Sequence, residues 1–137
     1  MEGKSVLDGL PRSLPALLKA KRIQEKVSRV GFDWENVQGT MKKVEEEWQE
    51  FKEAFQEQDI GHMEEELGDL LFAVANVARF LERCPEDALR KTIEKFERRF
   101  RYIERELERR NQKLEHASLE EMDKLWEDHK REEDKSS

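Results

Sequence analysis

The sequence predicts an all-α protein, an antiparallel bundle of about five helices whose core is completed by dimerisation. Apolar residues recur at steps of three and four along most of the chain, which is the period of an amphipathic helix. Hydrophobic residues make up 36% of the 137 residues and charged residues 43%, against typical proportions of about 45–50% and about 25%. Because this core is thin for one chain, we expect long helices that share it with a second copy.

The first predicted helix is bounded by residues that favour helix ends. Ser13 is a candidate N-cap, with Pro15 in the first turn, and Gly31 is a candidate C-cap. Two aromatic residues, Phe32 and Trp34, follow in a loop that also carries charges. Their side chains either stack on a base or fasten the loop to the core, and composition is compatible with both interpretations.

Two further helices are predicted at about residues 37–58 and 61–83, separated by a break at residues 59–61. Each has an apolar stripe at helical spacing. The stripe residues are Met41, Val44, Trp48, Phe51 and Phe55 in the first helix, and Met63, Leu67, Leu70, Leu71, Val74, Val77, Ala78 and Leu81 in the second. Gly68 and Ala75 lie on the far side of the second helix, where small residues suggest close helix packing across a dimer.

The last two predicted helices also show end signals. Pro85 occupies the first position of a helix that reaches about Asn111. Its apolar residues step 4-3-4-3-4, like a coiled-coil seam: Leu89, Ile93, Phe96, Phe100, Ile103 and Leu107. Ser118 and Glu121 form a capping box that opens the final helix. From about Asp128 the chain is polar, and we expect the helix to fray there.

Composition also restricts the class of protein. The net charge is −7 with acids and bases interspersed, so we expect no nucleic-acid partner. One cysteine, Cys84, excludes an internal disulfide, and no apolar run is long enough to span a bilayer. We expect a soluble, cytoplasmic protein without a membrane partner. Its organisation is a flexible lead-in at 1–12, one domain at 13–130 and a polar tail at 131–137.

Two pairs of acids at helical spacing suggest a metal site. Glu47 and Glu50 are three residues apart in the second predicted helix, and Glu66 and Asp69 are three apart in the third. With Glu46, two facing helices would gather five carboxylates, and a divalent cation would relieve their mutual repulsion. Mg²⁺ prefers such hard oxygen ligands. The alternative is an acidic face in contact with solvent, which a chain with 33 acids often presents.

Other kinds of site lack their residues. The sequence has no Cys/His cluster for zinc, and none of its three histidines follows a glutamate by three positions, as a di-iron bundle requires. A P-loop and a nucleophile elbow are also missing. The acid pairs therefore remain the main candidates for chemistry.

Residues 14–130 resemble the MazG-type nucleoside triphosphate pyrophosphohydrolases of the all-α NTP pyrophosphatase superfamily. The matching stretches are LPALLKAKRIQEKVSRVGFDW, KVEEEWQEF, EEELGDLLFAVANVARFL and EKFERRFRYIE. The family's metal motif, E-x-x-E followed after a variable gap by E-x-x-D, matches the two acid pairs described above. With the flanking GDLLF and KFERRF runs, the resemblance is specific and covers most of the chain.

The resemblance implies a dimeric helical enzyme that hydrolyses nucleoside triphosphates to the monophosphate and pyrophosphate with Mg²⁺, for which Mn²⁺ can substitute. The implied metal ligands are Glu47, Glu50, Glu66 and Asp69. One of the first two glutamates would also take the proton of the attacking water. The positions that match nucleotide or phosphate contacts are Lys43, Glu46, Lys95, Arg99 and Trp126. Such an activity would serve nucleotide-pool control.

The chain departs from the family pattern at Gln49, where an acid is common, and at Ile93, where asparagine is common. Gln49 faces away from the side of the helix that carries the candidate metal ligands, so we expect little effect there. Ile93, in contrast, would alter a polar contact near the substrate. An alternative function is a non-catalytic helical dimer that senses nucleotides. A stand-alone protein and one domain of a tandem protein are both compatible with the sequence.

Overall fold

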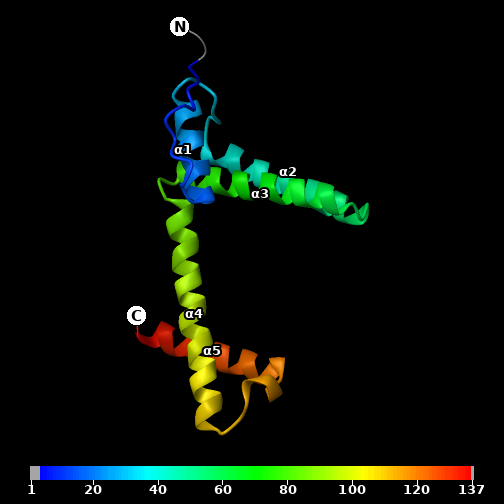
Figure 1. Ribbon diagram of the computed structural model, residues 1–137, viewed down its shortest axis with the longest axis vertical. Coiled ribbons are helices and arrows are strands. Elements are labelled where there is room, and N and C mark those ends of the chain that lie inside the picture. The colour runs from blue at the N-terminus through cyan, green and yellow to red at the C-terminus, as the bar shows by residue number, and fades with distance from the viewer. Residues whose placement is uncertain (1–3, 137) are drawn as a thin grey trace. The chain divides into compact units, whose positions relative to one another are not determined.

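The computed structural model describes residues 4–136, and all the regular structure in that range is helical (Figure 1). The helices are α1 (Ala16–Ser28), α2 (Val37–Gln56), α3 (Ile60–Phe80), α4 (Pro85–Arg109), the short 3-10 helix η1 (Leu114–His116) and α5 (Leu119–Ser136). This confirms the all-α prediction. Residues 1–3 of the predicted lead-in and residue 137 of the predicted tail lie outside the described range. Within that range no helix combines the length and apolar character needed to cross a membrane.

The described residues divide into two compact units, residues 4–88 and residues 89–136, and the division falls within α4. We call them the first unit and the second unit. The first unit contains α1, α2 and α3, and α3 packs against both α1 and α2. The second unit contains most of α4, together with η1 and α5.

Helix α1 begins two residues later than its predicted first residue. Pro15 is the N-cap, with an extended ψ of 143°, and no side chain caps the helix. A residue that precedes proline is disfavoured in helical conformation, which keeps Leu14 out of the helix and makes the predicted N-cap Ser13 wrong. At the other end the helix stops at Ser28, and Gly31 follows with a left-handed φ of 92°.

Helices α2 and α3 form an antiparallel pair (Figure 1). Both have capped N-termini, because Asn36 Oδ1 accepts from Gly39 N–H at 3.0 Å and Asp59 Oδ1 accepts from His62 N–H at 3.1 Å. The predicted break extended to Gly61, but this glycine lies inside α3. Gln58 instead takes the left-handed turn conformation, with φ of 57°.

Local end signals are confirmed in the second half of the chain. Pro85 is the first residue of α4, and Ser118 Oγ accepts from the Glu121 backbone N–H at 3.1 Å at the start of α5. The predicted fraying from Asp128 is wrong, since α5 continues to Ser136. The last turns are held because Glu133 accepts hydrogen bonds from two arginines of α4.

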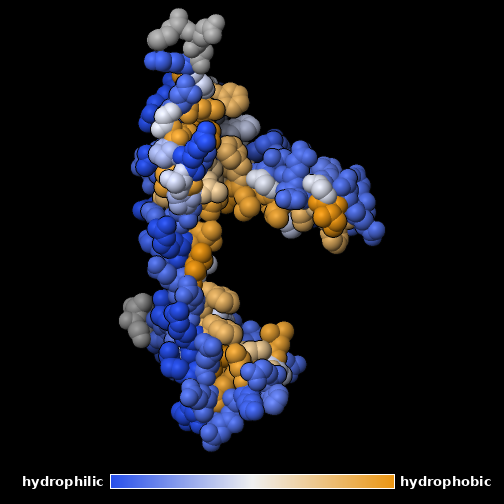
Figure 2. All heavy atoms as spheres, in the orientation of Figure 1, coloured by the Kyte–Doolittle hydropathy of each residue, from blue (hydrophilic) through white to orange (hydrophobic). Residues whose placement is uncertain are grey.

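The two units bury different kinds of side chain. In the second unit Ile103, Leu107 and Leu125 form an apolar core with aromatic and aliphatic neighbours packed around it. In the described part of the first unit, the only buried hydrophobic residues are alanines. The predicted stripes of α2 and α3 are largely exposed, and Figure 2 shows hydrophobic side chains gathered along one side of this pair. The exposed members, each 44–59% accessible, are Met41, Trp48, Phe55, Leu67, Leu71, Val74 and Leu81.

Candidate functional site

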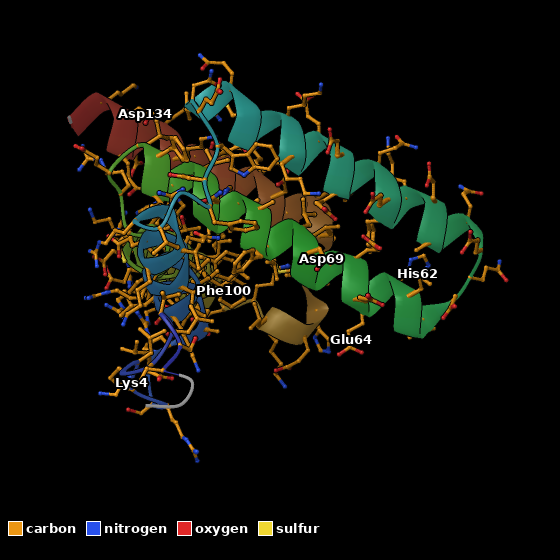
Figure 3. All side chains as sticks on the ribbon, turned by 90° about the horizontal axis from the view of Figure 1, so that it is seen from above. Lys4, His62, Glu64, Asp69, Phe100 and Asp134 are labelled. Atoms are coloured by element: carbon orange, nitrogen blue, oxygen red, sulfur yellow. The ribbon has the colours of Figure 1, made fainter. Side chains whose placement is uncertain are left out.

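Three of the four predicted metal ligands lie together where α2 packs against α3. Glu47 extends from α2, and Glu66 and Asp69 extend from neighbouring turns of α3. One carboxylate oxygen of each residue lies within 4.8 Å of the other two. Glu47 is only 5% exposed and Glu66 only 8%, whereas Asp69 is exposed along the middle of α3 (Figure 3). The helical spacing therefore brings carboxylates of two helices to one point.

The two buried acids of this group each keep one oxygen unpaired. Glu47 Oε2 and Glu66 Oε2 have no hydrogen-bond partner among the described residues. Burial of an unpaired carboxylate oxygen is unfavourable unless a donor or a cation compensates for the lost water. Hard carboxylate oxygens are the ligands that Mg²⁺ prefers. The three residues therefore suit a divalent cation.

The fourth predicted ligand, Glu50, lies beside this group and is exposed. The negative charge of Glu47, followed by a hydrogen-bonding interaction with Glu66, raises the pKa of Glu50. This acid therefore interacts with both buried carboxylates, although it does not belong to the group within 4.8 Å. Its exposure leaves it accessible to water.

Lys43 is tied to the acid cluster, as an ion pair one turn before Glu47. Its Nζ lies 2.8 Å from Glu47 Oε1. This hydrogen bond is the largest cause that lowers the pKa of Glu47 and also the largest that raises the pKa of Lys43. Glu46, the remaining acid of the predicted set on α2, is exposed, and its charge also raises the pKa of Lys43.

His62 is a neighbour of the cluster that the sequence motif did not reveal. Its Nε2 lies 3.2 Å from Glu66 Oε1 and its Nδ1 lies 3.5 Å from Glu57 Oε2. It lies near the turn that joins α2 and α3 (Figure 3). Burial lowers the pKa of His62, but hydrogen bonds to the two glutamates outweigh this effect and raise it. The i, i+4 spacing of His62 and Glu66 was the available sequence signal. A hydrogen bond of this kind to a candidate metal ligand fixes the orientation of its carboxylate.

A pocket of about 710 Å³ adjoins the acid cluster within the first unit. Glu47 and Asp69 belong both to the pocket wall and to the cluster. The remaining lining residues are Ile23, Gln24 and Val27 of α1, Gly31, Phe32, Asp33 and Trp34 of the loop, Lys43 of α2, and Phe72, Ala73, Asn76 and Arg79 of α3. This volume suits a small-molecule ligand.

The loop wall of the pocket is fixed to α3 by an ion pair that the sequence did not predict. The Arg79 guanidinium donates to both carboxylate oxygens of Asp33, with Nη1 at 3.3 Å from Oδ2. Arg79 Nε also donates to Asn76 Oδ1 at 2.8 Å. The two sides of this contact are separated by 46 residues, so no local pattern could reveal it.

The two loop aromatics both line the pocket. Phe32 is 79% exposed, and Trp34 is partly exposed with one edge against Gly39 at the start of α2. Trp34 is 45% exposed, so neither aromatic ring is buried in the core. Both rings border the space that a ligand would occupy.

Two of the remaining predicted contacts lie together in the second unit. The Arg99 guanidinium lies over the Trp126 ring, 5.4 Å from its centroid, and Trp126 also contacts Phe96 at 5.1 Å. Arg99 Nε donates to Glu133 Oε1 at 2.8 Å, and the Arg99 and Arg98 guanidinium groups lower the pKa of Glu133 to about 2. Lys95 is exposed one turn before Arg99.

The sequence matches a known family over half of its length. Residues 35–103 match the model of the MazG nucleotide pyrophosphohydrolase domain. This match includes both acid pairs, Lys43, Lys95 and Arg99. It ends before Trp126.

Curated relatives extend the similarity to most of the chain. The nucleoside triphosphate pyrophosphohydrolase/pyrophosphatase MazG of Thermotoga maritima is 47% identical over 83% of this chain and 44% of its own length. The nucleoside triphosphate pyrophosphohydrolase of Escherichia coli K12 is 47% identical over 94% of this chain and 50% of its own length. The uncharacterized protein YabN of Bacillus subtilis is 47% identical over 96% of this chain and 27% of its own length. The chain thus spans half or less of the length of these relatives.

Proposed function

Because this chain belongs to the MazG nucleotide pyrophosphohydrolase family, we propose that it hydrolyses nucleoside triphosphates and deoxynucleoside triphosphates to the monophosphate and pyrophosphate. The observation that carries the proposal is the carboxylate cluster with its two unpaired buried oxygens, two of whose members, Glu47 and Asp69, line a pocket of about 710 Å³. A triphosphate placed in this pocket would meet the acids only as a metal complex, since bare phosphate would be repelled by them.

We propose that Glu47, Glu66 and Asp69, with Glu50 beside them, hold Mg²⁺, and that Mn²⁺ can substitute. Bound Mg²⁺ supplies neutralisation of phosphate charge and a water of lowered pKa. Two neighbouring residues of the chain orient the carboxylates that would hold the ion. Lys43 orients Glu47 through its 2.8 Å ion pair, and His62 orients Glu66 from the other side at 3.2 Å.

Glu50 is the acid best placed to take the proton from the attacking water. Glu47, the other candidate, is buried and engaged by Lys43. Glu50 is exposed and adjoins both buried acids. We therefore assign the general base to Glu50 and an orienting and ligand role to Glu47.

We propose that Lys43, Lys95 and Arg99 neutralise phosphate charge, with Glu46 tuning Lys43 and Trp126 stacking on the nucleoside. Arg99 is already paired with Glu133 and lies over the Trp126 ring. A phosphate must therefore compete with Glu133 for the Arg99 guanidinium.

We propose that a second copy covers the exposed apolar face of α2 and α3, giving a homodimer. The residues of this face include Trp48, Leu71 and Val74, each about half exposed within the single chain. Contiguous apolar surface of this kind marks an interface. We also place the protein in the cytoplasm, where its substrates are abundant and its single cysteine, Cys84, would remain reduced.

The proposal is tested by product analysis after incubation with each nucleoside triphosphate in Mg²⁺. Monophosphate and pyrophosphate would support cleavage between the α and β phosphates. Diphosphate and inorganic phosphate would mean that a different bond breaks. Nucleotide binding without products would favour the nucleotide-sensing alternative.

Glu50→Gln tests the assignment of the base within the same assay. We expect turnover to fall roughly 100-fold or more, since general-base catalysis typically contributes about 10²–10⁴. Glu53→Gln is the matched control, because Glu53 is an exposed glutamate on the same helix and outside the cluster. Near-normal turnover in Glu50→Gln would remove this role, and circular dichroism checks that the helices remain.

A further inference from the structure

Gln24 places a buried, unpaired hydrogen-bond acceptor in the wall of the pocket. The residue is 4% exposed and lies on α1. Its Nε2 donates to the Phe72 backbone carbonyl of α3 at 2.9 Å. Its Oε1 has no hydrogen-bond partner among the described residues. The proposed reaction does not use this group.

The Phe72 contact fixes the orientation of the Gln24 amide. Rotation of the amide by half a turn would place Oε1 against the Phe72 carbonyl oxygen, so that two acceptors would face each other. Nε2 is therefore the atom bound to α3, and Oε1 is the atom left for a ligand. A buried acceptor without a partner is unfavourable. A ligand that donates a hydrogen bond there would recover part of this cost.

The two cationic side chains of the pocket wall are both bound to neighbouring groups. Arg79 is bound by Asp33 and Asn76, and Lys43 is bound by Glu47. The neighbours of Gln24 in the wall are mainly apolar, including Ile23, Val27 and Phe72. The pocket near α1 therefore offers a flat ligand an unpaired acceptor beside apolar walls.

We propose that this pocket receives the nucleobase and that Gln24 Oε1 accepts a hydrogen bond from an exocyclic amino group of the base. This inference rests on the proposed function. It assigns a preference for bases with an amino group over their oxo counterparts, cytosine over uracil and adenine over hypoxanthine. The bond is made at the edge of the base, which leaves the faces of the ring free for stacking.

The oxo counterparts fit this wall less well. Where cytosine carries an amino group, uracil carries a carbonyl oxygen, which would face the Gln24 oxygen without a donor between them. The cationic side chains of the wall, Arg79 and Lys43, are already bound to the carboxylates of Asp33 and Glu47. One hydrogen bond together with one unpaired acceptor corresponds to a preference of roughly tenfold.

The test measures the binding of α,β-imido analogues of CTP and UTP in Mg²⁺ by calorimetry, which does not depend on turnover. In the wild-type protein we expect the CTP analogue to bind about tenfold more tightly. In Gln24→Met, which keeps the length of the side chain and removes the amide, we expect a ratio near one. Gln56→Met, at an exposed glutamine at the end of α2, should keep the wild-type ratio.

Each outcome separates this inference from the proposed activity. A wild-type ratio near one would overturn the role of Gln24 whether or not the variant folds, and so would a tenfold ratio that persists in folded Gln24→Met. Absence of binding by both analogues would overturn the pocket as a nucleotide site. The expected ratios without pyrophosphate release from CTP would uphold the inference and contradict the enzymatic activity.

Discussion

The two compact units of this chain bury opposite kinds of side chain. In the first unit the buried residues other than alanines and Pro85 are polar or charged: Gln24, Thr40, Glu47 and Glu66. In the second unit the buried residues are Ile103, Leu107 and Leu125. Three buried polar side chains of the first unit keep an unpaired oxygen, whereas the carboxylates of Glu106 and Glu133 in the second unit are paired with arginines.

This difference indicates that the second unit is built mainly for stability, whereas the first unit is built mainly for binding. The second unit has an apolar core and paired charges outside it, although Leu89, Ile93 and Phe96 at the start of α4 are about half exposed. The first unit departs from this arrangement in two ways, since its acids are buried and its apolar stripes are exposed. Both departures are unfavourable in the isolated chain and would be relieved by a partner, a cation for the acids and a second copy for the stripes.

The largest effect on stability is expected in the core of the second unit. Leu107→Ala removes a side chain that is 1% exposed and should lower the free energy of unfolding by about 2–5 kcal/mol. Urea denaturation followed by circular dichroism measures the change. Leu119→Ala is the control, because Leu119 is exposed at the start of α5 and should cost about 0.5 kcal/mol or less. Equal costs for the two variants would contradict the apolar core of the second unit.

A smaller effect is expected on association through the first unit. Leu71→Lys places a charge in the exposed stripe of α3 and should raise the dimer dissociation constant roughly tenfold or more, which is about 1.4 kcal/mol. Sedimentation equilibrium measures the constant. Leu119→Lys makes the same change at an exposed leucine of the second unit and should leave it unaltered. A monomeric wild-type protein would contradict the proposed dimer.

The smallest effect concerns the pH dependence of the second unit. The Arg99 and Arg98 guanidinium groups lower the pKa of Glu133 from 4.5 to about 2. Because the pKa is lower in the folded state, this carboxylate contributes stability above about pH 4.5, and the contribution is lost as the pH falls towards 2. Thermal melts at pH 5 and pH 2.5 should show a smaller loss in Glu133→Gln than in the wild type.

Glu108→Gln provides the comparison for this small effect, since Glu108 is an exposed glutamate of the same unit. It should lose as much stability on acidification as the wild type. If Glu133→Gln and Glu108→Gln respond alike, the arginine contacts of Glu133 do not set its pKa.

Local features of this fold could be predicted from the sequence, because their causes lie within a few residues. Pro85 and the pair Ser118 and Glu121 mark helix starts through contacts one turn apart. The i, i+3 spacing of the acids placed each pair on one side of its helix. The apolar period identified the stripes of α2 and α3, but period alone does not tell whether the same chain covers them.

Long-range contacts could not be predicted in this way. Gln24 contacts a carbonyl 48 residues away, and Arg99 contacts Glu133 across 34 residues. No pattern near Gln24 distinguishes it from an exposed glutamine, so its role emerges only when α1 packs on α3. At the α2–α3 turn, Gln58 rather than Gly61 takes the left-handed conformation, which shows that residue type favours a turn position without fixing it.

The buried acids of the first unit are proposed to bind a divalent cation. Thermal melting with and without Mg²⁺ tests this proposal most directly. The wild type and the control Glu65→Gln, at an exposed neighbour on α3, should melt at a higher temperature with Mg²⁺. Glu66→Gln should gain little, because it removes the charge of one ligand. An equal gain in Glu66→Gln and the wild type, or no gain in the wild type, would contradict this proposal.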